Sequence, residues 1–278
     1  MSPDAPTPPP PRGRPNVIIV LIPLLIVLIT FLFWYTTWFG RRLSDTEMSE
    51  YLSDASVPHK TQHALAVLAG EIQRGDPSAR RWYPDLLKLA ASPEPELRQM
   101  SAWVMGQDNQ NPEFHRALRN LLLDPAVMVR GNAALALVRY GDSSGEPDLV
   151  RLLRPYELTA AASGKVSVKV KPGDDLNPGS LVARIATGSR TLDVRSPLSG
   201  QLDKLVAADG ATVAAGQRLA ILAPGADQVW EALRALYLIG RPADLPDVER
   251  YAAGAAGMPQ RVRVQAQLTE QAIHTRGR

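Results

Sequence analysis

The sequence contains no cysteine among its 278 residues. This absence excludes disulfide bonds, cysteine-ligated zinc, covalently attached haem and catalysis by a thiol, but it does not fix the cellular compartment. A strong charge imbalance is missing as well, because 31 lysines and arginines stand against 28 aspartates and glutamates. A net charge of +3 is too small to indicate nucleic-acid binding, so we expect no nucleic acid among the partners.

The patterns that mark many enzymes are absent too. No glycine-rich loop opens a helix to cradle a phosphate, and no Ser/His/Asp set or carboxylate pair stands at a recognised spacing. We interpret the adjacent Asp174 and Asp175 as turn residues. The sequence therefore predicts a protein that is not an enzyme, has no catalytic residues and carries no cofactor.

Few histidines are available for metal binding. His59 and His63 stand four residues apart, a spacing at which two imidazoles can share one helix face and a metal ion. No acidic base accompanies them in the arrangement of a zinc protease, and only His115 and His274 remain as further histidine ligands. We interpret the pair as capping or solvent-facing residues and expect no metal site.

A proline-rich tail and a long apolar run begin the chain. Residues 1–16 are rich in Pro, Ser and Thr and should be disordered. Residues 17–39 contain no charge and exceed the roughly 20 residues that span a bilayer. Trp34, Tyr35 and Trp38 lie at one end of this run, as in the aromatic belt of a membrane interface. A cleaved signal peptide would be shorter and followed by small residues, so the run predicts a single transmembrane helix in the lipid bilayer.

Residues 158–222 contain one short pattern written twice. Three glycines recur in the same order and at an almost constant offset, which marks two homologous halves of one β unit. In the first half, valines alternate with lysine and serine, as expected for a strand with one buried face. The glycine pairs are Gly164 with Gly200, Gly173 with Gly210, and Gly179 with Gly216.

This twofold pattern resembles the biotinyl/lipoyl-like barrel-sandwich domain, and the resemblance implies an all-β domain of two interlocked halves over residues 158–225. In that family a lysine at the hairpin between the halves carries the cofactor. Alignment on Ser196-Pro197 places Ser189 and Arg190 there, and neither side chain can form the amide that holds biotin or lipoate. Export adaptor proteins have a similar domain, but with a long coiled-coil hairpin where this chain has only a few residues. We expect a structural or adhesive barrel.

The rest of the folded chain has a helical pattern that repeats. Arg98, Arg130 and Arg263 stand at equivalent places, and all but one of the intervals between helix starts fall within the roughly 20–50 residues of repeat architectures. Removing the β unit restores a uniform interval, so this unit interrupts the series. The repeats resemble HEAT repeats, in which small alanines let helices stack. The resemblance implies an α-solenoid over residues 45–157 and 226–276, with the barrel inserted into one repeat.

Two sets of repeat residues have alternative interpretations. The arginines could form a basic stripe for an acidic partner or RNA, or a structural ladder that bonds to turns of neighbouring repeats, and we favour the ladder. The aromatic residues could anchor a partner or fill the core between repeats, and their periodic placement favours the core. These aromatic residues are Trp82, Trp103, Trp230 and Tyr237.

Together these features predict a multi-domain α and β protein: a single transmembrane helix, a HEAT-like α-solenoid and an inserted all-β barrel-sandwich domain. This architecture favours a non-catalytic, membrane-anchored scaffold or assembly subunit that binds other protein subunits of a larger membrane complex, respiratory or for transport. The alternative is an export-adaptor-like component. Arginines balance on the two sides of the apolar run, and long domains translocate regardless of charge, so we expect a bacterial inner-membrane protein with its bulk in the periplasm.

Overall fold

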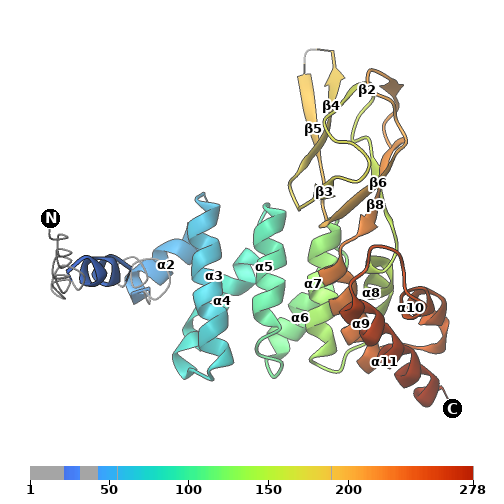
Figure 1. The fold of residues 1–278 in the computed structure, drawn as a ribbon. Helices are drawn as coiled ribbons and strands as arrows, with labels where there is room; N and C mark the ends of the chain where they lie inside the picture. Colours follow the sequence, from blue (N-terminus) through green and yellow to red (C-terminus); the bar gives the residue numbers. More distant parts are fainter. Residues whose placement is uncertain (1–21, 32–42, 55, 189, 278) are drawn as a thin grey trace, which may run out of the picture. The chain divides into compact units, whose positions relative to one another are not determined.

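The chain divides into two compact units, Met1–Asp45 and Thr46–Arg278. The second unit combines helices with a region of β-strands (Figure 1). The structure is a computed structural model of the chain, and it describes residues 22–31, 43–54, 56–188 and 190–277.

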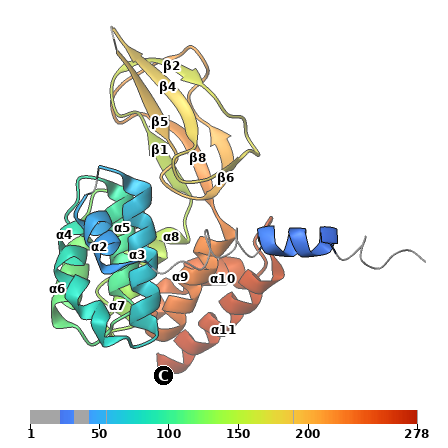
Figure 2. The same ribbon diagram turned by 90° about the vertical axis from the view of Figure 1, so that its left-hand side faces the viewer.

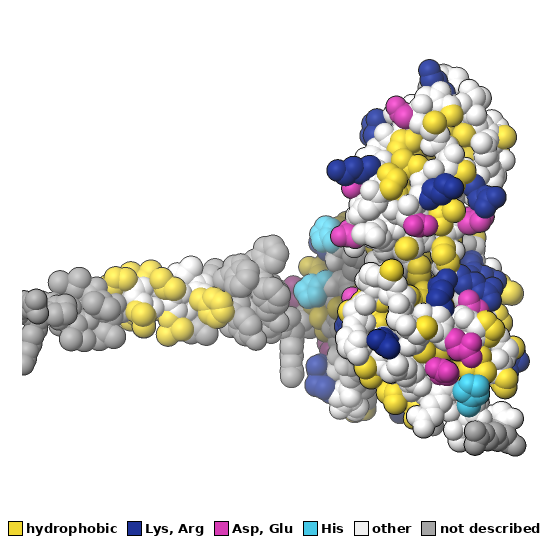
Figure 3. All heavy atoms as spheres, turned by 45° about the vertical axis from the view of Figure 1, so that its right-hand side comes forward, with side chains coloured by type: hydrophobic (Ala, Val, Ile, Leu, Met, Phe, Trp, Pro, Cys, Tyr) yellow, Lys and Arg dark blue, Asp and Glu magenta, His cyan; other side chains and the backbone are white. Residues whose placement is uncertain are grey.

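The first unit contains part of the predicted transmembrane run 17–39. Residues 22–31 form a helix, and its apolar side chains are exposed (Figure 3). Among the described residues, no helix is both long and apolar enough to cross a bilayer. Outside the described residues lie the predicted tail 1–16, the remainder of the run, and Trp34, Tyr35 and Trp38 of the predicted aromatic belt.

The helices of the second unit follow one another in pairs. Proline begins several of them, because its fixed φ suits the first turn and its missing N–H is not needed there. The α-helices are α2 (Asp45–Ser53), α3 (Pro58–Gln73), α4 (Tyr83–Leu89), α5 (Pro95–Met105), α6 (Pro112–Leu121), α7 (Val127–Val138), α8 (Glu146–Leu152), α9 (Ala226–Ile239), α10 (Leu245–Ala252) and α11 (Gln260–Arg276), and the 3-10 helices are η1 (Pro77–Trp82) and η2 (Pro242–Asp244).

One helix of each pair packs against its equivalents in the neighbouring pairs. We name this series, α3, α5, α7, α9 and α11, the inner row, because each member contacts the next (Figures 1 and 2). Small residues allow the close approach: a Cβ on Gly106 would lie 2.8 Å from the Cβ of Ala136. Ala102, Ala133 and Ala134 are fully buried. The alanine-rich segments thus form the stacked faces that the repeat pattern predicted.

The β-strands interrupt the pair formed by α8 and α9, which still pack against each other. The first strand, β1 (Tyr156–Thr159), is the antiparallel neighbour of the last strand, β8 (Arg218–Pro224), with Tyr156 opposite Leu222. The chain therefore leaves the helices and returns to them at nearly the same place, as an inserted domain requires.

The strands form two antiparallel four-stranded sheets, with the orders β1-β8-β6-β3 and β5-β4-β2-β7. The two orders become identical when β1, β2, β3 and β4 are exchanged with β5, β6, β7 and β8, respectively. This pseudo-twofold relation agrees with the twofold pattern of the sequence. The intervening strands are β2 (Gly164–Val168), β3 (Asp175–Leu176), β4 (Leu181–Thr187), β5 (Arg190–Arg195), β6 (Gly200–Leu205) and β7 (Thr212–Val213).

One glycine pair explains why the two halves repeat. A Cβ on Gly164 would lie 2.3 Å from the carbonyl oxygen of Ala186, and a Cβ on Gly200 would lie 2.1 Å from that of Ala223. No side chain fits at either place, where a neighbouring antiparallel strand lies against the glycine, so both positions require glycine. Leu198 lies within the barrel segment but is buried in the hydrophobic cluster of the helices. The barrel has its own interior, which includes Val166, Ile185, Leu202 and Leu222.

Candidate functional site

The hairpin between β4 and β5 is the place where a carrier lysine would stand. Thr187 pairs with Arg190 across the hairpin, and Gly188 between them has a φ of 61°. Arg190 is exposed, whereas Ser189 lies outside the described residues. The position next to the tip therefore holds a guanidinium, which cannot be acylated by the chemistry that attaches biotin or lipoate.

One lysine that sequence reasoning overlooked lies close to this hairpin. Lys165 on β2 stands opposite Ala186 of β4, and its Cε lies 3.8 Å from the place of a Cβ on Gly210. Its side chain thus lies along the neighbouring turn, and it starts from a strand instead of a hairpin tip. The other lysines of the barrel segment are Lys169, Lys171 and Lys204, all exposed.

A cavity of about 550 Å³ opens on the inner row, and we name it the inner-row groove. α5, α7 and α9 supply its walls, so three consecutive repeats contribute. Trp103 from α5 is 42% exposed and Leu238 from α9 is 60% exposed, which leaves large apolar surfaces open to a partner. The polar side chains of the groove are Gln107, Asn132, Arg139, Glu231 and Arg234.

The apolar surface continues from this groove onto the last helix. Tyr237 and Leu238 of α9 line two smaller hollows with Leu268 of α11. Val264 of α11 is exposed as well. The exposed apolar residues therefore follow the inner row from its middle to α11.

The expectation that all four aromatic residues fill the core is wrong for two of them. Trp103 and Tyr237 are exposed on the inner row, since α5 and α9 bury their other faces against neighbouring helices. Trp82 is buried, at 8% exposure, as expected. Trp230 is partly buried, and the guanidinium carbons of Arg234 and Arg261 lie 4.6 Å and 5.7 Å from its ring centre.

Positive charge borders the groove. Arg139 donates a hydrogen bond to Gln107 at 2.8 Å, and Arg234 lies 3.6 Å from Glu231. Arg276 on α11 donates to the backbone carbonyl oxygens of Tyr237 and Gly240, which fixes its charge at the far end of the exposed surface. Three arginines against one glutamate give this surface a positive balance, which favours a partner with acidic residues.

The arginine ladder is present at two of its three predicted positions. The Nε of Arg98 lies 2.6 Å from a carboxylate oxygen of Asp124, and its Nη1 donates to the carbonyl oxygens of Ser92 and Pro93. This hydrogen bond to Asp124 raises the pKa of Arg98. Burial opposes the ionisation of Asp124, but the hydrogen bonds from Arg98 and from the Ala126 amide outweigh it and lower the pKa of this carboxyl group.

Arg130 repeats this geometry one helix pair later. Its Nε lies 3.0 Å from Asp148, and its Nη1 donates to the carbonyl oxygens of Asp124 and Pro125. Arg263 departs from the prediction: it is exposed beside Gly254, and no carboxylate of the described residues pairs with it. The ladder is therefore structural in the N-terminal repeats and does not extend to α11.

The histidines divide into three settings. His59 and His63 are exposed on α3, as expected for solvent-facing residues. His115 lies 2.8 Å from Asp142 and stacks on Tyr140. His274 lies near Glu249 and Glu270, in a group that sequence reasoning missed.

Two buried carboxylates meet between α8 and η2. Glu146 and Asp244 are each 4% exposed, and Arg241 pairs with Glu146. Burial, together with the neighbouring Glu146, raises the pKa of Asp244 to about 6. A proton is therefore held at this pair below that pH.

Comparison with known proteins identifies the two kinds of domain. Residues 83–163 match the family of HEAT repeats, and residues 156–222 match a family described as "Biotin-requiring enzyme". The chain thus contains HEAT repeats and a biotin/lipoyl-type domain, as its sequence patterns predicted. No curated protein matches the chain.

A solved structure with a similar part is that of a single-chain, multi-domain long-chain acyl-CoA carboxylase. The sequence identity is 19% and the TM-score is 0.25. The alignment covers 36% of this chain and only 11% of that chain, so most of the carboxylase has no counterpart here.

Proposed function

We propose that this protein is a non-catalytic scaffold or assembly subunit of a larger membrane complex, of the respiratory or transport kind. Residues 17–39 would anchor it in a bacterial inner membrane, and the helical repeats and the barrel would bind neighbouring subunits from the periplasmic side. The observation that carries the proposal is the inner-row groove, with its exposed Trp103 and Leu238.

The groove supports a protein-binding role for two reasons. Solenoids use the extended surface of their stacked repeats for partners, and this groove spans three of them. Tryptophan and arginine dominate the energies of protein interfaces, and Trp103 lies in the groove with Arg139 and Arg234. The mixed lining of apolar side chains, amides and arginines suits a segment that presents apolar and acidic residues.

The barrel supports a role without a cofactor. Arg190 stands beside the hairpin tip, the sequence has serine at the preceding position, and Lys165 starts from a strand. Intact-mass spectrometry of the protein from its native source should therefore give the mass of the unmodified chain after terminal processing. A biotin or lipoate adduct on any lysine of residues 158–225 would overturn the non-enzymatic assignment.

The decisive experiment is affinity purification of the full-length tagged protein after gentle detergent extraction, followed by identification of the bound membrane subunits. Trp103→Ala combined with Leu238→Ser should release the subunits that the wild type retains. Leu123→Ser is the matched control, because Leu123 is 87% exposed and lies outside the groove. Equal retention by the groove variant and the control would rule the groove out as the binding surface.

Orientation needs a separate measurement. Protease added to intact spheroplasts should digest the helical repeats if the bulk is periplasmic. Digestion only after lysis would reverse the proposed orientation and leave the scaffold role to be tested in the cytoplasm.

The alternative function is an export-adaptor-like component. The biotin/lipoyl-type domain of the chain favours this function. However, the hairpin between β4 and β5 is too short for the long coiled coil of such adaptors. Co-purification of a transporter together with an outer-membrane channel would support the adaptor, whereas a set of inner-membrane subunits alone would support the scaffold.

A further inference from the structure

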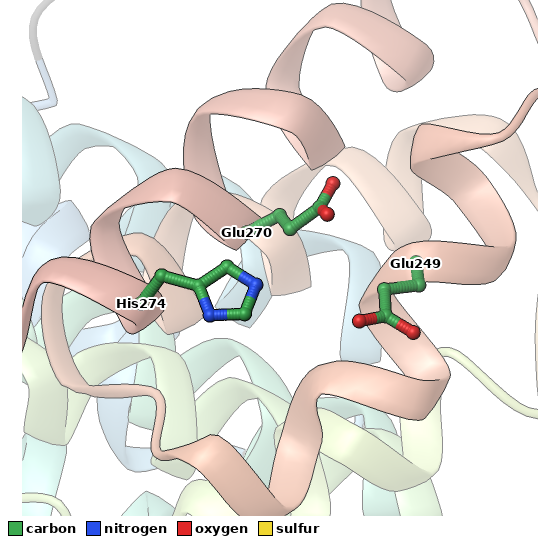
Figure 4. Close-up of side chains that lie close together, drawn as sticks. All are labelled: Glu249, Glu270 and His274. Atoms are coloured by element: carbon green, nitrogen blue, oxygen red, sulfur yellow. The ribbon is translucent and has the colours of Figure 1, made fainter. Parts of the chain in front are cut away.

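We propose that Glu249, Glu270 and His274 form a binding site for a divalent transition-metal ion such as Zn²⁺. One potential ligand atom from each residue lies within 4.8 Å of the others. Figure 4 shows the three side chains converging from α10 and α11. This inference is independent of the scaffold role.

The spacing of the residues accounts for the convergence. Glu270 and His274 stand four residues apart on α11, so both project from one face of the helix. Glu249 reaches the same space from α10, which packs against α11. The site therefore joins two helices that only the tertiary structure brings together.

The donor set selects the class of metal. An imidazole nitrogen with two carboxylate oxygens suits Zn²⁺ and its transition-metal neighbours, whereas Ca²⁺ and Mg²⁺ prefer oxygen ligands alone. Three protein ligands leave one position of a tetrahedral ion open to water or to a ligand from another molecule.

The local charges leave room for a cation at this place. None of the three side chains has a hydrogen bond or ion pair with another described residue, and the neighbouring arginines bind elsewhere. Arg250 donates to the carbonyl oxygen of Leu153, and Arg276 donates to the carbonyl oxygens of Tyr237 and Gly240. Two carboxylates therefore face each other, and no cationic side chain of the described residues balances their charge. A bound metal ion would supply the missing positive charge.

The position of the site gives it a structural effect. A metal ion held by α10 and α11 would tie together the two helices of one repeat, and it would bind the folded state but not an unfolded chain. Thermal unfolding of the repeats should then shift upward by about 2–5 °C at a saturating metal concentration.

The test uses the full-length protein in detergent, freed of metal by a chelator, and Zn²⁺ as the probe. Isothermal titration calorimetry should give one ion per chain. Glu249→Gln and His274→Ala should each weaken binding by at least about tenfold and remove the shift in melting temperature. All three residues are at least partly exposed, so both variants should fold, which circular dichroism verifies.

The matched control is the double variant His59→Ala/His63→Ala, since this exposed pair has the same spacing but no converging glutamates. It should bind Zn²⁺ like the wild type. Absence of stoichiometric binding, unchanged binding by His274→Ala, or loss of binding only in the control would each overturn the proposal. Equal competition by millimolar Ca²⁺ would overturn the assignment to a transition metal.

Discussion

The barrel and the helical repeats are both built by repetition, but the barrel closes and the repeats remain open. In the barrel, the two halves cover each other, and the large apolar residues left exposed among its described residues are Leu192 and Val206. In the repeats, each helix pair covers the next along the row, and among the described residues one face of the inner row stays exposed. The exposed apolar residues on that face are Trp103, Tyr237, Leu238, Val264 and Leu268.

This difference indicates where each region can bind. A closed pair of halves buries its apolar surface internally, so the barrel offers a partner mainly polar loops and strand edges. An open series offers a surface whose length grows with the number of repeats. The comparison also separates two local constraints: in the barrel, glycines lie against backbone carbonyl oxygens, whereas the repeats combine small residues between helices with partly buried arginine–aspartate pairs.

The largest effect should come from a methyl group at Gly200, where β6 lies against its antiparallel neighbour β8. Gly200→Ala would place a Cβ 2.1 Å from the carbonyl oxygen of Ala223, and we expect a loss of more than about 3 kcal/mol. Gly216→Ala is the control, because its φ of 79° is strained for alanine but its surroundings are open. The control should lose only about 1 kcal/mol in chemical denaturation. Equal losses would show that backbone contact does not define the barrel.

The repeats should be most sensitive at the ladder. Asp124→Ala leaves the partly buried guanidinium of Arg98 without its carboxylate, and the free energy of unfolding should fall by about 2–3 kcal/mol. Asp227→Ala removes a pair in which the aspartate is 86% exposed, and it should change stability by less than about 1 kcal/mol. Urea denaturation of both variants measures the two losses of stability. Similar losses would show that the ladder contributes no more than an exposed ion pair.

Replacing residues 158–225 by a short Gly/Ser linker tests whether the two regions fold separately. The helices should keep a cooperative thermal transition, because α8 and α9 pack directly. Stability should fall by about 1.5–3 kcal/mol, since Leu198 leaves the helical cluster. Leu198→Ala in the intact chain should reproduce most of this loss. A non-cooperative melt after the replacement would place the barrel in the core of the repeats.

The smallest effect concerns pH and the carboxylate pair of the repeats. The pKa of Asp244 is raised to about 6 in the folded protein, above its unfolded value, so its contribution to stability is complete at low pH and is lost as pH rises through 6. We expect a decline of roughly 1–2 kcal/mol between pH 4 and pH 7. Asp244→Asn should flatten this part of the profile, whereas Asp203→Asn, at an exposed barrel position, should not. An unchanged profile in Asp244→Asn would assign the titration to another group.

The features that sequence reasoning predicted are those that local backbone geometry enforces. The glycine pairs were visible because positions such as Gly164 and Gly200 exclude any side chain, and this exclusion repeats with the fold. Arg98 and Arg130 were visible because each bonds to carbonyl groups only five and six residues before it. Such constraints leave a regular spacing in the sequence.

The features that it did not predict depend on neighbours distant in sequence. Trp103 follows the same helical period as a core residue, and only the packing of α5 against its neighbours decides that it faces outward. Arg263 has the position of a ladder arginine but meets the Gly254 turn instead of a carboxylate. The spacing of Glu270 and His274 was readable, but Glu249 joins them only when α10 packs on α11.

The pairing of the first and last strands also has a mechanical consequence. Tension applied through the flanking helices would reach the barrel at Tyr156 and Leu222 once the packing of α8 on α9 yields. Because β1 and β8 are antiparallel neighbours pulled from the same end, their hydrogen bonds would break one after another in a zipper geometry instead of together in shear. The inserted domain would then extend the chain at low force and lengthen the tether between the two groups of helices, a step that single-molecule stretching can record.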